Sequence, residues 1–101
     1  MKPLKFHPEA EREMNDAASW YEAQQCGLGK RLLHAIEDAI GRIVLNPEIF
    51  QLVDKDVRRC LTRPFPFGVL FRSGPELIEI LAVMHLHREP EYWKHRRAEP
   101  G

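Results

Sequence analysis

A long apolar run near the C-terminus, followed at once by polar and aromatic side chains, most constrains how this chain folds. Residues 77–86 are almost all apolar and many are β-branched, which predicts a strand buried on both faces. Strand alternation predicts one face made of Ile78, Ile80, Ala82, Met84 and Leu86. The other face is predicted to hold Leu77, Leu81 and Val83. Such a strand needs covering elements on both sides, and it ends where imidazole and guanidinium groups begin.

Two amphipathic helices are predicted before this strand. The first covers residues 9–25, with Pro8 at its start and glutamates in its first turns, where the helix dipole favours acids. The second covers residues 28–45, has a broad apolar face and stops at an Asn-Pro pair. Because a short glycine-containing link joins them, the two helices are predicted to form an antiparallel hairpin whose apolar stripes pack on a sheet.

Three further strands are predicted over residues 2–7, 57–62 and 67–73, and residues 48–56 are predicted to be a loop. Strands joined by short turns are antiparallel. The fold class is therefore α+β, with an N-terminal strand and a helical hairpin packed on a largely antiparallel four-stranded sheet. The chain has too few elements to cover the second sheet face, which predicts a partner there.

Length and charge describe one small, neutral domain. The 101 residues are expected to form a single domain with a short helical tail over residues 91–97 and a frayed end over residues 98–101. Fifteen basic and fifteen acidic residues give a net charge of +0, which argues against coating nucleic acid by bulk charge. Without a signal-like or membrane-length apolar segment, the chain is expected to be cytoplasmic, with no membrane partner.

Neither the cysteines nor the glycines indicate a cofactor. Cys26 and Cys60 lack metal-binding spacing, and two reduced thiols are favoured, although a bridge between them stays open at this point. The chain has no phosphate-binding glycine-rich loop and no nucleophile elbow. We therefore expect no cofactor and no metal ion.

Six short motifs spread over nearly the whole chain occur in a specific order. They are Trp20-Tyr21-Glu22, Gly27-Leu28-Gly29, Asn46-Pro47, Val57-Arg58-Arg59, Phe65-Pro66-Phe67 and the tail His85-x-x-Arg88-x-Pro90-x-Tyr92-Trp93. Together they resemble the RelE/ParE superfamily of toxins from bacterial type II toxin–antitoxin modules, also called plasmid-stabilisation proteins. The tail resembles the ParE-like branch. The chain departs from the common pattern at Pro64, and at Phe67 and Phe71, where tyrosine is frequent, so any role of a phenol hydroxyl there is lost.

The resemblance implies a small toxin that a cognate antitoxin neutralises. ParE-like members are implied to inhibit DNA gyrase, and the tail motif together with the neutral net charge favours this branch. The alternative is a RelE-like endoribonuclease that cleaves mRNA on the ribosome without a metal. A weaker alternative is an inactive member that only binds its antitoxin. Self-association as a homodimer through the open sheet face competes with antitoxin docking.

Metal-free RNA cleavage would need a base, an acid and cations around one phosphate. If the chain is a ribonuclease, the candidate catalytic residues are His85, His87, Arg59, Arg63, Arg72, Arg88 and Tyr92. The imidazoles would serve as acid or base, the arginines would supply charge, and the tyrosine would supply a hydroxyl. Histidines and arginines at a strand end are more often surface or ion-paired groups, so the sequence favours no firm catalytic residue.

Two further side-chain roles are predicted. Arg58 and Arg59 are neighbours on a strand and therefore point to opposite faces, which predicts one structural arginine and one that faces a ligand. The sequence leaves open which is which. Trp93 is predicted to pack the tail onto the domain rather than to stack on a nucleic-acid base.

Overall fold

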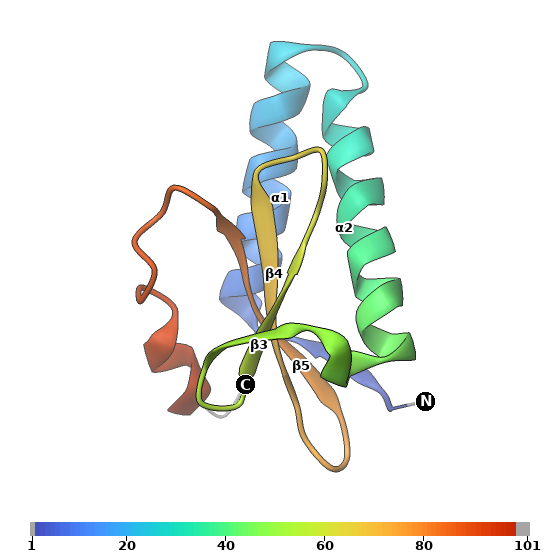
Figure 1. Cartoon of the computed structure of the whole chain (residues 1–101). Coiled ribbons are helices and arrows are strands. Elements are labelled where there is room, and N and C mark those ends of the chain that lie inside the picture. The colour runs from blue at the N-terminus through green and yellow to red at the C-terminus, as the bar shows by residue number, and fades with distance from the viewer. Residues whose placement is uncertain (1, 99–101) are drawn as a thin grey trace.

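The computed structural model describes residues 2–98 as two long helices beside one five-stranded sheet (Figure 1). The elements are β1 (Leu4–Phe6), α1 (Pro8–Gln24), α2 (Leu28–Leu45), β2 (Gln51–Asp54), β3 (Val57–Leu61), β4 (Phe67–Ser73), β5 (Ile78–His85) and the 3-10 helices η1 (Pro47–Ile49) and η2 (Lys94–Ala98). The α+β class is confirmed, and both long helices lie within one residue of their predicted bounds. The tail is a 3-10 helix that begins later than predicted. Most of the predicted frayed end, residues 99–101, lies outside the described residues.

The sheet has one strand more than the sequence predicted. Residues 51–54, expected within a loop, form the edge strand β2, which pairs antiparallel with β3 in the sheet order β1-β5-β4-β3-β2. The turn between them contains Lys55 at a positive φ of 42° and no glycine or asparagine, so the usual hairpin signal is missing from the sequence. Since β1 pairs parallel with β5, the sheet is mixed rather than wholly antiparallel.

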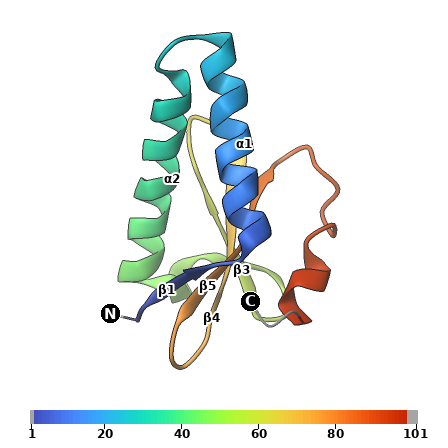
Figure 2. The same ribbon diagram turned by 180° about the vertical axis from the view of Figure 1, so that it is seen from behind.

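The helical hairpin covers one face of the sheet, as Figures 1 and 2 show from opposite sides. The core between the two layers is fully buried and draws on both helices and on three strands. Its members include Ala10, Leu32, Ile36, Ala39, Ile43, Cys60, Val69, Phe71, Ile78 and Ile80. Cys60 is a free thiol within this core, and burial raises its pKa, whereas Cys26 is a free thiol on the surface. Neither helix of the described chain is long and apolar enough to cross a membrane.

The link between the helices is closed by one carboxylate. Glu22 accepts hydrogen bonds from the backbone N–H groups of Gly27, at 2.8 Å, and Gly29, at 3.0 Å. These two bonds lower the pKa of the Glu22 carboxyl. Gly27 has a φ of +89°, and a Cβ on Gly29 would lie 2.3 Å from the carbonyl oxygen of Ala18. The predicted glycine link is therefore needed both for its left-handed turn and for the close approach of the helices.

A β-bulge in β5 makes the predicted assignment of side chains to its two faces wrong beyond Ile80. Leu70 of β4 pairs with Ala82 and Phe71 pairs with Ile80, so Leu81 is an extra residue on β5. An extra residue exchanges the two faces of a strand beyond it. Ile80, which precedes the bulge, packs against the helices. Ala82, which follows the bulge, packs on the opposite face, although strict alternation predicted the same face for both residues.

The second sheet face is covered in part by the chain's own tail, which contradicts the expectation that it lacks a covering element. Trp93 is only 2% exposed and packs on this face. Its indole Nε1 donates to the carbonyl oxygen of Pro90 at 2.8 Å. The residues beneath it are Val57, Leu70, Leu81, Ala82 and Met84. The prediction that Trp93 packs the tail onto the domain is confirmed.

Candidate functional site

The end of β5 brings two histidines together beside the first helix. The His85 ring lies edge-on to Phe67 at 5.1 Å between centroids, and the His87 ring is 5.3 Å from His85. His85 Nδ1 accepts a hydrogen bond from the backbone N–H of His87 at 3.1 Å. Because the bulge shifts the alternation of β5, His85 faces the helices and borders a hollow of about 320 Å³ next to Trp20 and Tyr21.

Arg88 and Tyr92 lie beside His85 around a second hollow of about 200 Å³. The Arg88 guanidinium stacks over the Tyr92 ring at 4.0 Å from its centroid. The Tyr92 hydroxyl donates to Glu13 at 2.5 Å. Burial raises the pKa of Tyr92, and the Glu13 carboxylate raises it further, so the phenol stays protonated and acts as a donor. This hydroxyl is thus already engaged in holding the tail to α1.

Arg72 lies at the other end of the sheet. It forms an ion pair with Glu79 at 2.7 Å and donates to the carbonyl oxygen of Arg97 at 3.4 Å. In the pairing of β4 with β5, Arg72 is opposite Glu79 and Phe67 is opposite His85. Arg72 and Phe67 are five residues apart on β4, so roughly 17 Å of strand separates Arg72 from the position of His85. Arg72 is therefore held by structural partners, far along the sheet from the histidines.

The question of the two neighbouring arginines has a clear structural answer. Arg58 donates to the backbone carbonyl oxygens of Glu48, at 3.2 Å, and Phe50, at 2.8 Å, and so fixes the loop before β2. Arg59 lies on the opposite face, next to Gly68. A Cβ on that glycine would come within 3.0 Å of the Arg59 Cγ and Cδ atoms. Arg58 is the structural arginine and Arg59 is the one that faces open surface.

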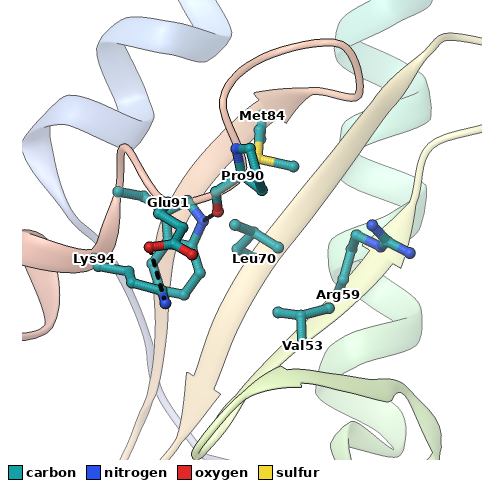
Figure 3. Close-up of a pocket in the computed structure, with 8 residues that line it drawn as sticks. Val53, Arg59, Leu70, Met84, Pro90, Glu91 and Lys94 are labelled. Atoms are coloured by element: carbon teal, nitrogen blue, oxygen red, sulfur yellow. Dashed lines mark hydrogen bonds and ion pairs between the residues drawn. The ribbon is translucent and has the colours of Figure 1, made fainter.

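A small cleft between the sheet and the tail borders Arg59 (Figure 3). Its volume is about 140 Å³, and it is lined by Val53, Arg59, Leu70, Met84, Pro90, Glu91, Trp93 and Lys94. Glu91 and Lys94 form an ion pair at 3.5 Å on its rim. In Figure 3 the Arg59 guanidinium points away from this ion pair. The cleft is apolar at its floor and charged only at its edge.

The structure divides the seven candidate residues into three groups. His85, His87, Arg88 and Tyr92 come together at the end of β5. Arg59 and Arg63 lie at the β3 end, around a separate hollow, and Arg72 lies at the far end of β4. Among residues 2–98, no group of three His, Cys, Asp or Glu side chains is placed to hold a metal ion.

Sequence reasoning missed Glu13, which accepts a hydrogen bond from Tyr92, and Arg42, which lines the same hollow as Arg59 and Arg63. Glu13 follows Ala10 by three residues and precedes Ala17 by four, so it lies at helical spacing within an apolar stripe. An acid in such a stripe is a signal of a buried partner. Arg42 is an ordinary basic residue in the last turn of a helix, and its contribution depends on where β3 passes.

Comparison with known proteins identifies the family. The family model described as the ParE toxin of type II toxin–antitoxin systems, parDE, matches residues 4–90. Two proteins named Toxin ParE2, from Mycobacterium tuberculosis strains CDC 1551 and H37Rv, are each 33% identical to the chain over 88 residues, covering 86% of this chain and 84% of theirs.

A solved structure supports the fold independently. The chromosomal ParDE toxin–antitoxin system from P. aeruginosa matches with a TM-score of 0.63 at 18% identity, over 86% of this chain and 98% of that one. At that identity the match shows the fold alone. The family model and the two relatives show more: the chain belongs to the ParE toxin family and is the toxin component of a type II toxin–antitoxin module, whose partner is a cognate antitoxin.

Proposed function

We propose that this toxin inhibits DNA gyrase by binding to it in the cytoplasm, without chemistry of its own. The observation that carries the proposal is the division of the candidate residues into three groups. A ribonuclease that works without a metal needs its acid, base and cations within hydrogen-bond reach of one phosphate. Here His85 faces the helices while Arg59 and Arg72 lie on the opposite sheet face.

Two further features support a binding role. Tyr92 and Arg72, which would have to act on RNA, already have protein partners in Glu13 and Glu79. The tail lies across the second sheet face through Trp93, which leaves a small cleft of about 140 Å³ there. A net charge of +0 also offers little general attraction for polyanionic RNA.

We also propose where the antitoxin docks. An apolar hollow of about 390 Å³ lies between the helical hairpin and β1, lined by Phe6, Met14, Leu33 and Ile40 among others. The exposed end of β1 at Leu4, which is 37% exposed, extends it. An amphipathic antitoxin segment would bury this surface. Because the tail covers part of the second sheet face, the hairpin side is the larger apolar opening.

One comparison tests the choice of target. Purified toxin is added to a gyrase supercoiling reaction and, separately, to ribosomes programmed with mRNA. We expect loss of supercoiling with intact transcripts, and we expect His85→Ala to leave that inhibition unchanged. Codon-register cleavage of mRNA that His85→Ala abolishes, with gyrase unaffected, would refute the proposal. Tolerance of the toxin in cells without its neighbouring gene product would instead indicate an inactive member.

A further inference from the structure

Three arginines from three parts of the chain surround one hollow at the β2 edge of the sheet. Its volume is about 310 Å³, and we call it the arginine hollow; its lining residues are Arg42, Phe50, Gln51, Arg59, Leu61 and Arg63. Arg42 comes from the last turn of α2, Arg59 from β3, and Arg63 from the loop after β3. None of these described lining residues carries a carboxylate, although the chain as a whole is neutral, so this is a local concentration of positive charge.

Most guanidinium donors in the arginine hollow remain available to a ligand. Arg63 is exposed and makes no hydrogen bond or ion pair with any residue between 2 and 98. Among the described residues, the Arg59 guanidinium donates one hydrogen bond, to Gln51 Oε1 at 3.5 Å. Arg42 donates to the Leu61 carbonyl at 3.2 Å and pairs with the exposed Asp38 at 3.4 Å. Since each guanidinium carries five N–H donors, the three together leave many unused.

The position of Arg59 depends on a glycine in the neighbouring strand. Gly68 of β4 has no side chain, and the Arg59 Cγ and Cδ atoms lie 3.0 Å from the position that a Cβ would take, which is closer than ordinary van der Waals contact. The aliphatic part of Arg59 is thus laid across the sheet surface. In Figure 3 its guanidinium points away from the tail. A defined backbone feature therefore places this charge beside the other two.

We propose that the arginine hollow binds carboxylates of an acidic segment of a partner protein, with apolar residues of that segment packing alongside. Guanidinium groups bind carboxylates through paired, charge-assisted hydrogen bonds. Apolar side chains close in sequence to the lining residues are unusually exposed: Leu45 by 78%, Ile49 by 69% and Leu52 by 50%. Such side chains suit a protein partner, which offers apolar groups beside its acids.

The same surroundings argue against a nucleic-acid phosphate as the ligand. Binding to a nucleic-acid backbone places cations along a track, one for each phosphate. Here the three charges converge on one hollow, and the exposed leucine and isoleucine side chains lie close in sequence to its lining residues. A single anionic side chain, or two neighbouring ones, fits this convergence better than a polyanion.

A peptide-binding measurement tests the proposal directly. A fluorescein-labelled octapeptide containing three glutamates and three leucines is titrated with the toxin and followed by fluorescence anisotropy. We expect Arg63→Gln and Arg42→Gln each to weaken binding by about 5-fold, and added salt to weaken it as well. The matched control is Arg31→Gln. Arg31 is exposed in the first turns of α2, so this substitution removes the same charge far from the hollow. It should leave the affinity unchanged.

Three outcomes would overturn the proposal. The first is equal affinity for a peptide with glutamine in place of each glutamate, since the hollow would then bind apolar groups alone. The second is an equal effect of Arg31→Gln and Arg63→Gln, which would mean diffuse attraction. The third is tighter binding of a single-stranded octanucleotide than of the acidic peptide. Because the assay contains neither gyrase nor ribosomes, a negative result would refute the peptide-binding proposal without affecting the proposal that the toxin inhibits gyrase.

Discussion

Glu13 in the first helix and Arg96 near the C-terminus, 83 residues apart in the chain, form an ion pair at 2.9 Å directly over the β-bulge. Glu13 accepts from the backbone N–H of Val83 at 3.0 Å, and Arg96 donates to the carbonyl oxygen of Leu81 at 3.0 Å. Both backbone groups belong to residues beyond Ile80, where the pairing of β1 with β5 ends. The ion pair satisfies both groups and binds the tail to the helix and the sheet at once.

Replacing Glu13 should therefore destabilise the whole domain. Burial alone would lower the pKa of Arg96, but hydrogen bonding to Glu13 and the Glu13 charge outweigh it and raise the pKa. Glu13→Ala would leave a nearly buried guanidinium without its partner, and we expect a loss of about 3 kcal/mol in the free energy of unfolding. Urea denaturation of the wild type and of Glu13→Ala measures this difference in the free energy of unfolding.

Asp16→Ala is the control for that change. Asp16 is exposed on the same helix, and removing it should alter the free energy of unfolding by less than about 0.5 kcal/mol. Equal effects of the two substitutions would contradict a specific role for the Glu13–Arg96 pair.

The two tryptophans should differ sharply in their contribution to stability. Trp93 is 2% exposed and packs on the second sheet face, whereas Trp20 is 60% exposed. We expect Trp93→Ala to cost about 3 kcal/mol of unfolding free energy, because it opens a large cavity and frees the tail. Trp20→Ala should cost less than about 1 kcal/mol. Thermal unfolding followed by circular dichroism compares them, and a similar drop in both variants would mean that the tail does not pack as described.

Two glycines of the second helix should respond to alanine with opposite signs. A Cβ on Gly29 would meet the backbone oxygen of Ala18 at 2.3 Å, and a backbone atom of a packed helix cannot move away. Gly29→Ala should therefore destabilise by about 2 kcal/mol. A Cβ on Gly41 would meet no described atom of another element within 4 Å, so Gly41→Ala should stabilise by about 0.5 kcal/mol through helix propensity. Midpoints of urea unfolding decide this, and a stabilising Gly29→Ala would disprove the close helix contact.

The bond between Glu22 and the helix link should make stability depend on pH. Hydrogen bonds from Gly27 and Gly29 lower the pKa of Glu22 below its ordinary value of 4.5. The folded state then favours the carboxylate, so this contribution is fully present above pH 4.5 and is lost as the pH falls through the folded-state pKa. The stability difference between the wild type and Glu22→Gln should be largest near pH 7 and shrink towards pH 3. A constant difference over that range would contradict a stabilising role of the Glu22 hydrogen bonds to Gly27 and Gly29.

The amino-acid sequence by itself determined the elements that depend on local chemistry. The helix bounds follow from apolar periodicity, from Pro8 at the start of α1 and from the glycines of the link, and the structure places both helices within one residue of these bounds. The buried strand β5 follows from its long apolar run. The motifs spread along the chain also carried the family resemblance, because they depend on residue identity and order rather than on contacts.

Tertiary structure alone decided the features that join distant parts of the chain. The bulge at Leu81 depends on the pairing of β5 with β4, and it reversed the faces that strict alternation predicted for Ala82 and Val83. The covering of the second sheet face by Trp93 depends on a tail anchored by Glu13, 83 residues before its partner Arg96. The convergence of Arg42, Arg59 and Arg63 likewise depends on where α2 ends relative to β3. Local propensity contains no information about such long-range contacts, since each is fixed only when the two packed layers and the tail meet.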